Sequence, residues 1–493
     1  MSGEDSNTRN GLLSSDLRAV LSALEEAGEL RMVEGADWDV ELGAITELMA
    51  LRDGPALLFD RIKGCAPGHR VLANLLNSPR RVALLLGLPA DTHPLEVVRE
   101  LRRRLSSIRQ ADPLEVTDTP VREEVHRGAD VDLWEFATPR WHEHDGGRYI
   151  GTGCAVVTRD RDSGWVNLGT YRVQVHDRDT LGLYIQRSHH GALMQRQYWD
   201  RGEPCPVAVA IGLQPGLLLG SFLTIPNGVS EYQWSGGLMG QPVQVFPGEV
   251  TGLPLPASAE IVLEGFCLPP SVETRLEGPF GETIGYYASG AREEPVIKVE
   301  RVYHRQNPII VGAPPLRPPA SSSATYLFRA ANAWSELERA GVPDVRGVWM
   351  HPSGASGLLA IVAIKQRYAG HAKQAGLTLM SGRGGTGLGR FVIVVDDDID
   401  PSDIDQVLWA LATRCDPATS IDIVRGMTVP DLDPRLTPAQ RAVGDYTTSR
   451  AILDACRPFT WINEFPRTLS VSDELRERVL RDWSALFDER PQR

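Results

Sequence analysis

The sequence predicts an α/β protein organised around a central β-rich body, a barrel or split barrel. Three observations predict this class. Helical apolar periodicity dominates up to about residue 125, short β-branched runs separated by Gly, Pro and Asp occupy 148–312, and strand and helix patterns alternate after residue 340. A chain of 493 residues is long enough for more than one core. We expect four parts: an α/β lobe at 1–125, the barrel at 126–323, a linker helix at 324–340 and a C-terminal α/β domain at 341–493.

The N-terminal lobe is predicted to be mainly helical. Its first helix, near 17–24, follows Ser14 and Ser15, which can cap a helix N-terminus, and Gly28 can end it. A short apolar run at 56–59 suits a strand. Further helices are expected at 44–51, 78–86 and 95–108.

The central segment reads as a series of short strands. Regular spacing of β-branched runs favours a barrel or split barrel. The longest apolar stretch, 206–220, is interrupted by Gln214 and Pro215 and is shorter than the ~20 residues of a membrane helix, so we expect a buried strand and a turn. The expected strands are 155–158, 171–175, 207–211, 243–246, 260–263, 296–303 and 309–311.

The last third alternates strands and helices, which predicts a three-layer α/β domain. A Pro- and Ser-rich loop at 312–323 leads into the linker helix, which Gly341 and Pro343 can end. A final amphipathic helix at 470–487 could pack against a second copy, and we expect a homodimer. The other elements expected here are strands near Val348 and at 358–365 and 391–395, a helix around His371, and a helix capped by Ser402.

Composition and charge restrict the possible partners. Lys and Arg number 51 against 64 Asp and Glu, a formal net charge of −13, so the surface repels nucleic-acid phosphates. The first residues lack a basic segment followed by an apolar one, so we expect a cytoplasmic protein without a membrane anchor. The 6 cysteines form no CxxC pair, which favours reduced structural thiols.

Three motifs suggest sites but have simpler interpretations. GRGGTG at 382–387 precedes a predicted strand, whereas a dinucleotide fingerprint follows one, so we interpret it as a loop. The acidic run at 396–398 is typical of a solvated turn. His142 and His144 alternate on one strand and offer two neighbouring metal ligands, which leaves a metal site open as an alternative.

More informative is a glycine-rich segment at 276–286 that holds two acids, Glu277 and Glu282, five residues apart. Glycines allow backbone to approach a ligand closely. Two clustered carboxyls push their pKa values apart, so that one can keep a proton and act as a general acid. A solvated turn with two surface acids is the alternative interpretation.

This segment, EGPFGE at 277–282 followed by Gly285-Tyr286, resembles the hallmark of the UbiD family of decarboxylases, which use prenylated FMN. The resemblance extends over nearly the whole chain and implies the UbiD-like fold, with the flavin held by the split barrel. Further segments that look like family motifs are NLGTYR at 167–172, YIQRSH at 184–189, IPNGVSE at 225–231, DDID at 397–400 and WALATR at 409–414.

The resemblance implies that Asn167, His189 and Glu231 bind a divalent ion, usually manganese, which also holds the cofactor phosphate. An amide oxygen, an imidazole and a carboxylate suit an octahedral ion that keeps open positions. A companion potassium ion is implied on backbone carbonyls, with Glu231 shared. The implied potassium ligands are Leu168, Gly220, Ser221 and Leu223, and the other implied cofactor contacts are Arg172, Ser188, Leu223, Thr224 and Arg390.

The family's Glu-Arg-Glu network would be Glu277, Arg172 and Glu282. Arg172 would hold the substrate carboxylate with its planar fork, while Glu277 keeps that guanidinium in place. Glu282 would arrive protonated and protonate the carbon that CO₂ leaves, which requires a raised pKa. The resemblance implies a covalent adduct between substrate and prenylated FMN, a flavin prenyltransferase as cofactor supplier, and carboxylation as the reverse reaction at high CO₂.

Departures from the family pattern concern the substrate. Arg390 stands where many relatives have Lys. RGMTV at 425–429 replaces the RGFPL of ferulic acid decarboxylases, so that Met427 and Val429 would face a wider substrate pocket, and the small Ser188 points the same way. We therefore expect a polycyclic or heteroaromatic acid of the phenazine or indole type.

Three alternatives remain open. The first is a decarboxylase of acrylic-type acids in the same family. The second is a metal-dependent hydrolase without flavin, which would use His142, His144 and Glu231. The third is a non-catalytic flavin carrier, which would keep the cofactor after Glu282→Gln and release no CO₂ from any acid.

Overall fold

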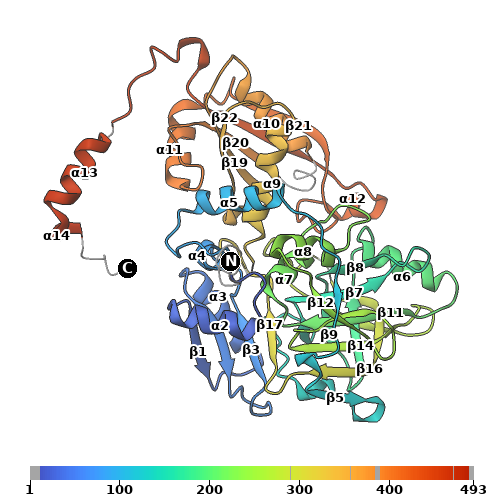
Figure 1. The fold of residues 1–493 in the computed structure, drawn as a ribbon. Coiled ribbons are helices and arrows are strands. Elements are labelled where there is room, and N and C mark those ends of the chain that lie inside the picture. Colours follow the sequence, from blue (N-terminus) through green and yellow to red (C-terminus); the bar gives the residue numbers. More distant parts are fainter. Residues whose placement is uncertain are drawn as a thin grey trace.

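The computed structural model describes residues 11–288, 290–321, 323–355, 357–382, 389–469 and 471–487. Strands in these ranges form four sheets, and the largest is a central sheet of ten strands (Figure 1). The predicted α/β class with a β-rich centre is therefore confirmed. Part of the GRGGTG motif, residues 383–388, lies outside the described residues.

The N-terminal sheet contains a strand that joins it from far along the chain. Its order is β1-β2-β3-β17, and β17 (Ile309–Gly312) runs parallel to β3 (Arg70–Ala73). Placing 309–311 in the central body was therefore wrong. Every residue of β17 is buried, so its composition does not reveal which sheet it joins. The neighbouring elements are α2 (Leu17–Glu26), β1 (Leu30–Glu34), α3 (Glu41–Ala50), β2 (Ala56–Asp60) and α4 (Pro79–Leu85).

The central sheet follows the order β6-β9-β10-β16-β14-β11-β7-β8, with β5 and β15 also pairing with β16. Its longest strand, β16 (Arg292–His304), links these pairings. The remaining strands are β5 (Glu124–Arg127), β6 (Arg148–Gly151), β7 (Cys154–Arg159), β8 (Val166–Gly169), β9 (Arg172–Val175), β10 (Thr180–Tyr184), β11 (Cys205–Ile211), β14 (Ile261–Cys267) and β15 (Thr274–Glu277).

Two predictions in the central segment need correction. The strand expected in the apolar stretch 206–220 is present as β11, but the expected turn is helix α7 (Pro215–Phe222), whose first residue is a proline that suits a helix start. The strand expected at 243–246 belongs to a separate small sheet of β4 (Leu114–Glu115), β12 (Gln244–Pro247) and β13 (Pro254–Pro256). Helices α6 (His190–Trp199) and α8 (Glu231–Met239) complete this part.

The C-terminal sheet has the order β18-β19-β20-β22-β21. Its helices pack on it as predicted, and α5 (Pro94–Ser106), from the N-terminal part of the chain, joins them against α9 and β18 (Figure 1). The elements are α9 (Thr325–Arg339), β18 (Val345–Met350), β19 (Leu359–Ile364), α10 (His371–Ser381), β20 (Phe391–Asp396), α11 (Ile404–Arg414), β21 (Ile421–Thr428), α12 (Pro438–Val443) and β22 (Thr447–Ala455).

Three local predictions differ from the structure. The caps of α2 and α11 are Asp16 and Asp403 rather than the neighbouring serines, because a carboxylate accepts backbone N–H bonds equally well.

The acidic run at 396–398 is not simply solvated. Asp396 is buried and lies 3.3 Å from Arg414 and 3.0 Å from Arg457, which compensate its charge.

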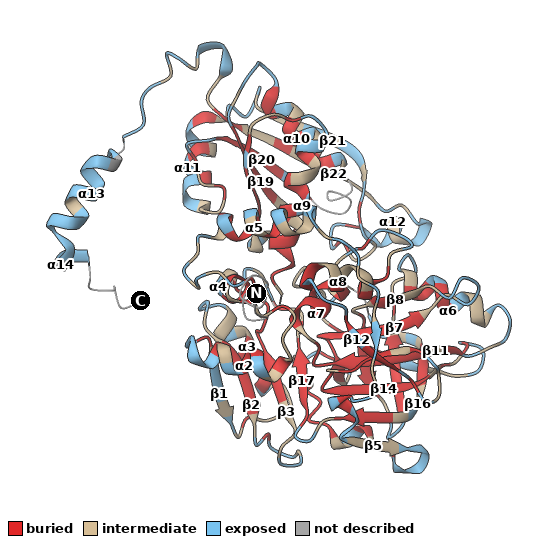
Figure 2. Ribbon diagram, in the orientation of Figure 1, coloured by how far each residue is buried: buried red, intermediate tan, exposed pale blue. Residues whose placement is uncertain are grey.

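Buried residues follow the sheets, whereas the C-terminal helices stand apart from the rest of the chain (Figure 2). These helices, α13 (Asp473–Asp482) and α14 (Ser484–Phe487), carry exposed apolar side chains, including Leu480, Trp483 and Phe487. Within the described ranges, every helix is too short or too polar to cross a bilayer.

Candidate active site

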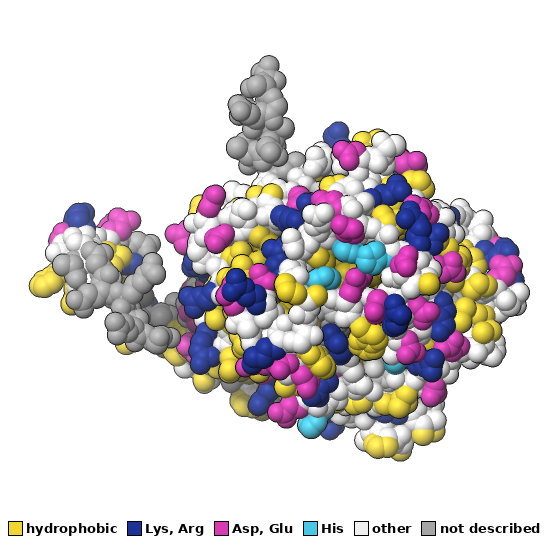
Figure 3. All heavy atoms as spheres, turned by 90° about the horizontal axis from the view of Figure 1, so that it is seen from below, with side chains coloured by type: hydrophobic (Ala, Val, Ile, Leu, Met, Phe, Trp, Pro, Cys, Tyr) yellow, Lys and Arg dark blue, Asp and Glu magenta, His cyan; other side chains and the backbone are white. Residues whose placement is uncertain are grey.

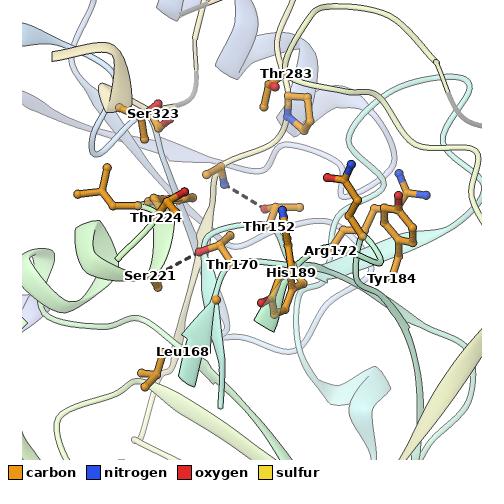
Figure 4. A pocket seen from close by; sticks show the side chains of 18 of the residues that line it. Thr152, Leu168, Thr170, Arg172, Tyr184, His189, Ser221, Thr224, Thr283 and Ser323 are labelled. Atoms are coloured by element: carbon orange, nitrogen blue, oxygen red, sulfur yellow. Dashed lines mark hydrogen bonds between the residues drawn. The ribbon is translucent and has the colours of Figure 1, made fainter. Parts of the chain in front are cut away.

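A cavity of about 450 Å³ lies against β8 and β9, the segments that lead into α6 and α8, and the loop that follows β15 (Figure 4). This volume is typical of a small-molecule site. Residues that are far apart in the sequence line it, so the fold assembles the site from most of the chain. The predicted site residues on its wall are Asn167, Leu168, Arg172, Ser188, His189, Ser221, Leu223, Thr224, Glu231 and Glu282.

One guanidinium joins the two acids of the glycine-rich segment. Arg172, the first residue of β9, donates from Nη2 to Oε2 of Glu277 at 2.7 Å and from Nη1 to Oε1 of Glu282 at 3.1 Å. The segment turns back within a few residues, because the Glu282 N–H donates to the Tyr286 carbonyl at 2.9 Å. Two charge-assisted bonds fix the plane of the guanidinium at the cavity wall.

The two carboxylates differ in their surroundings. Glu277 ends β15, is completely buried and also accepts a bond from the Tyr149 hydroxyl at 3.1 Å. It lies behind the cavity wall. The side chain of Glu282 is 16% exposed and lines the cavity. The geometry therefore assigns Glu277 to holding Arg172 and leaves Glu282 within reach of a bound molecule.

Arg172 stays charged in this buried position. Burial opposes its charge, but Glu277 and Glu282 outweigh that effect, so the pKa of Arg172 is raised above its usual value. Its guanidinium also stacks 4.4 Å from the ring centre of Tyr184. Of the five N–H donors of the guanidinium, one on Nη1 and one on Nη2 bond the two acids, so Nη donors remain for an anion.

A second group of side chains fits a divalent ion. Asn167 on β8, His189 at the N-cap of α6 and Glu231 at the start of α8 all line the cavity. The ring of His189 lies 5.8 Å from that of Tyr171. Desolvation in the cavity wall lowers the pKa of His189, which keeps the imidazole neutral and able to bind a metal.

Glu231 is a buried acid without a positively charged partner among the described side chains. Its side chain forms no ion pair among the described residues, and burial raises its pKa to about 7, although the Leu168 N–H donates to it at 2.7 Å. A bound cation would supply the missing positive charge and lower that pKa. The amide, imidazole and carboxylate donors therefore fit a divalent ion such as manganese.

The carbonyls predicted to hold potassium lie next to this group. The Gly220 carbonyl accepts the Leu223 N–H at 3.2 Å, and the Ser221 carbonyl accepts the Thr170 N–H at 3.0 Å. Each carbonyl oxygen keeps a second lone pair. The hydroxyls of Thr170 and Ser221 lie 3.0 Å apart (Figure 4). These oxygens stay a predicted potassium site.

Gly220 is required at its position because α7 packs closely on α8. A Cβ there would lie 2.2 Å from the Ser235 hydroxyl. We expect Gly220→Ala to lower the free energy of unfolding by about 1–3 kcal/mol through overpacking, as measured by thermal denaturation. The Ser235 hydroxyl is buried without a hydrogen-bond partner among the described residues. Adding Ser235→Ala should therefore restore stability, and a double variant as unstable as Gly220→Ala would contradict this explanation.

Several predicted residues do not reach the cavity in this structure. Gly220 lies behind Ser221, and Arg390 forms an ion pair with the buried Asp433. Met427 packs beside the hydrophobic core, and Val429 is buried with its N–H bonded to the Tyr446 carbonyl at 2.9 Å. His142 and His144, proposed for a hydrolase, are also absent from the lining. The roles of Arg390, Met427 and Val429 stay predictions.

Other lining residues were not predicted. Tyr184 and Gln186 belong to a quoted motif, but single aromatic or amide residues carry no signal of their own. Leu432 comes from the C-terminal part of the chain, where Gln186 also donates to Asp431 at 2.8 Å. Arg329 on α9 is a half-buried arginine in an amphipathic helix, and only the tertiary structure places it at the cavity.

Comparison with known families covers nearly the whole chain. Residues 21–104, 114–318 and 324–455 match the N-terminal, Rift-related and C-terminal domains of the family described as 3-octaprenyl-4-hydroxybenzoate carboxy-lyase, UbiD. A curated relative, phenolic acid decarboxylase of Bacillus subtilis, is 33% identical over 458 residues, which cover 90% of this chain and 92% of the relative.

Solved structures agree in fold. The UbiD-class enzyme HmfF from Pelotomaculum thermopropionicum, in complex with FMN, superposes with a TM-score of 0.83 at 29% identity, over 95% of this chain and all of that one. An evolved dimeric form of HmfF holds prenylated FMN and has a TM-score of 0.80 at 28% identity, with the same coverage. Vanillic acid decarboxylase of Sedimentibacter hydroxybenzoicus has a TM-score of 0.81 at 30% identity, over 96% and 99% of the two chains.

Proposed function

Since the chain belongs to the UbiD family of prenylated-FMN-dependent decarboxylases, we propose that it removes CO₂ from an aromatic carboxylic acid, with Arg172 as the carboxylate anchor and Glu282 as the proton donor. One observation carries these roles. The Glu277-Arg172-Glu282 network borders the same cavity that Asn167, His189 and Glu231 line.

Arg172 orients the substrate. Its guanidinium is held from behind by Glu277, which Tyr149 also contacts, so the cation keeps one orientation at the cavity wall. A planar cation whose Nη atoms each keep a second N–H can bind a carboxylate at a defined angle. The stack on Tyr184 further limits its motion. Fixing the carboxylate in this way raises the fraction of bound substrate that is ready to react.

Glu282 delivers the proton. It lines the cavity and accepts a bond from Arg172 at 3.1 Å, so its carboxyl group is within reach of a bound substrate. Loss of CO₂ leaves a pair of electrons on the substrate carbon, and the O–H bond of Glu282 breaks as the new C–H bond forms. The carboxylate then regains a proton from solvent before the next turnover.

The cofactor and its ions are proposed to occupy the same cavity. When bound, prenylated FMN supplies the electron sink that departure of CO₂ from an sp² carbon requires. Asn167, His189 and Glu231 would hold manganese, and the carbonyls of Leu168, Gly220, Ser221 and Leu223 would hold potassium. These cations would let a chain with a net charge of −13 bind an anionic cofactor phosphate. Ser188 and Thr224 offer hydroxyls on the same wall.

For the substrate we place phenolic acids first. The relatives in B. subtilis and S. hydroxybenzoicus are described as phenolic and vanillic acid decarboxylases. The preference for a phenazine- or indole-type acid rested on Met427, Val429 and Ser188, and only Ser188 lines the cavity. Polycyclic and acrylic-type acids are therefore included as further candidate substrates in the screen described below. A homodimer and cofactor supply by a flavin prenyltransferase also stay predictions.

The test is co-expression of the full chain with a flavin prenyltransferase, followed by an absorption spectrum and a CO₂-release screen. We expect bound flavin, and turnover with at least one hydroxylated benzoic acid. The screen should include vanillic and 3,4-dihydroxybenzoic acids, an indole and a phenazine carboxylic acid, and a cinnamic acid. Protein without flavin after co-expression would overturn the cofactor assignment. Turnover of the cinnamic acid alone would move the substrate class to acrylic acids.

A further inference from the structure

A second group of metal-binding side chains lies outside the proposed active site. His126 belongs to β5, Glu135 ends a short 3₁₀ turn (Leu133–Glu135), and His304 ends β16. One ligand atom from each lies within 4.8 Å of the others. We call these residues the His-Glu-His cluster. They line a separate surface pocket that also includes His69, and none of them lines the active-site cavity.

Strand pairing explains why the two histidines meet. β5 runs antiparallel to β16, with His126 opposite Val302 and Glu124 opposite His304. Positions diagonal to each other across an antiparallel pair share one face of the sheet and are within reach of long side chains. The face of the molecule seen from below carries histidine side chains among acidic and basic ones (Figure 3). The pairing of β5 with β16 therefore brings His126 and His304 to the same face of the sheet.

The cluster leaves two ring nitrogens without a partner. Nε2 of His304 and Nδ1 of the neighbouring His69 are buried without a hydrogen-bond partner among the described residues, whereas Nδ1 of His126 and Oε1 of Glu135 face each other at 3.2 Å. Buried polar atoms in folded proteins are nearly always paired, so a group of unpaired ones calls for a ligand or ion. Three imidazole nitrogens and one carboxylate oxygen are all suitable metal donors.

His304 is oriented as a metal ligand. It is only 6% exposed, and its Nδ1 lies 2.9 Å from the Arg305 carbonyl oxygen. Because a carbonyl can only accept, Nδ1 carries the proton and the lone pair resides on Nε2, the atom without a partner. Metal-binding histidines in proteins are fixed by this kind of bond from the second ring nitrogen.

The distances between the ligand atoms of the cluster are close to those of a tetrahedral zinc site. Zn²⁺ binds nitrogen and carboxylate oxygen at about 2.0–2.2 Å, so ligand atoms of a tetrahedral site lie about 3.3–3.5 Å apart. Nδ1 of His126 and Oε1 of Glu135 are already 3.2 Å apart. Since all three ligand atoms lie within 4.8 Å of one another, small side-chain movements would complete the set.

We propose that His126, Glu135 and His304 bind a divalent transition-metal ion of the zinc type, with His69 or water as the fourth ligand. Imidazole and carboxylate donors suit Zn²⁺ and Co²⁺ better than Mg²⁺ or Ca²⁺, which prefer all-oxygen sites. The ion would tie β5 and the turn that follows it to the end of β16. Its role would be structural and independent of decarboxylation.

The test uses Co²⁺, whose visible absorption reports coordination, on the full chain stripped with a chelator. The background variant His189→Ala removes the proposed active-site ligand. We expect the metal-free His189→Ala chain to bind one Co²⁺ at the His-Glu-His cluster. Binding should give a visible absorption spectrum and raise the thermal stability. Glu135→Gln, which keeps side-chain size, should weaken that binding by at least about 100-fold. His126→Ala should do the same, whereas His144→Ala, an exposed histidine outside the cluster, should not.

Folding and activity serve as checks. His126 and Glu135 are only partly buried, so their variants should keep the circular-dichroism spectrum of the metal-free parent. In the chain that retains His189, Glu135→Gln should leave decarboxylation unchanged. Binding of Co²⁺ that survives both Glu135→Gln and His126→Ala would overturn the proposal. So would the absence of Co²⁺ binding in His189→Ala, which would leave His126 and Glu135 as a metal-free ion pair.

Discussion

Replacing Glu282 with Gln should lower kcat by about 10²–10⁴-fold while leaving flavin bound, because positioned proton transfer contributes that range in enzymes. The amide keeps the volume of the side chain, and its carbonyl can still accept from Nη1 of Arg172, now 3.1 Å from Oε1. It has no acidic proton to give to the carbon that CO₂ leaves. The measurement is kcat at saturating substrate, together with flavin absorbance per chain.

The matched control is Glu293→Gln. Glu293 is an exposed acid on β16 that does not line the cavity, and it accepts a bond from the Thr274 hydroxyl at 2.7 Å. Its loss removes the same charge and should leave kcat within about threefold. In D₂O, Glu282→Gln should also slow exchange of deuterium into the product. Unchanged kcat in Glu282→Gln would assign the proton to another group, and loss of flavin would assign Glu282 to cofactor binding.

Short motifs allowed the site residues to be predicted from the sequence, because each motif carries its functional side chain in a fixed local context. Glu277 and Glu282 share one loop, and Arg172 sits at the start of a strand. The family resemblance also implied that Glu277 holds Arg172 while Glu282 faces the substrate. What the motifs could not predict is the part of Tyr149, which comes from β6 and bonds Glu277 from behind.

Contacts between distant segments were the least predictable. Leu432 reaches the cavity although the predicted pocket residues Met427 and Val429 do not, because β21 ends at Thr428 and the chain turns toward Gln186 only afterwards. Strand β17 joins the N-terminal sheet for a similar reason. Both of its faces are buried, so apolar composition cannot distinguish the two sheets. Local patterns predict an element, but its neighbours depend on the whole chain.

Replacing Arg172 with Lys should lower kcat/KM by about 10²-fold or more, although the positive charge remains. Arg172 uses two separate nitrogens to hold Glu277 at 2.7 Å and Glu282 at 3.1 Å. A single ammonium cannot contact both acids and still hold a substrate carboxylate in a fixed plane. Displacement of reacting groups by about 1 Å is enough to cost about 10²-fold. The stack on Tyr184 would also be lost.

Arg292→Lys is the control, because Arg292 stacks on the same tyrosine ring at 4.1 Å and pairs with Glu294 at 2.6 Å without lining the cavity. It should keep kcat/KM within about threefold. Since lysine leaves Glu277 with a nearby cation, Arg172→Lys should stay folded and bind flavin. Arg172→Ala should instead lose about 3–5 kcal/mol of stability, because it leaves Glu277 buried and unpaired. If Arg172→Lys and Arg292→Lys reduced activity equally, the tyrosine stack rather than carboxylate binding would explain the effect of Arg172.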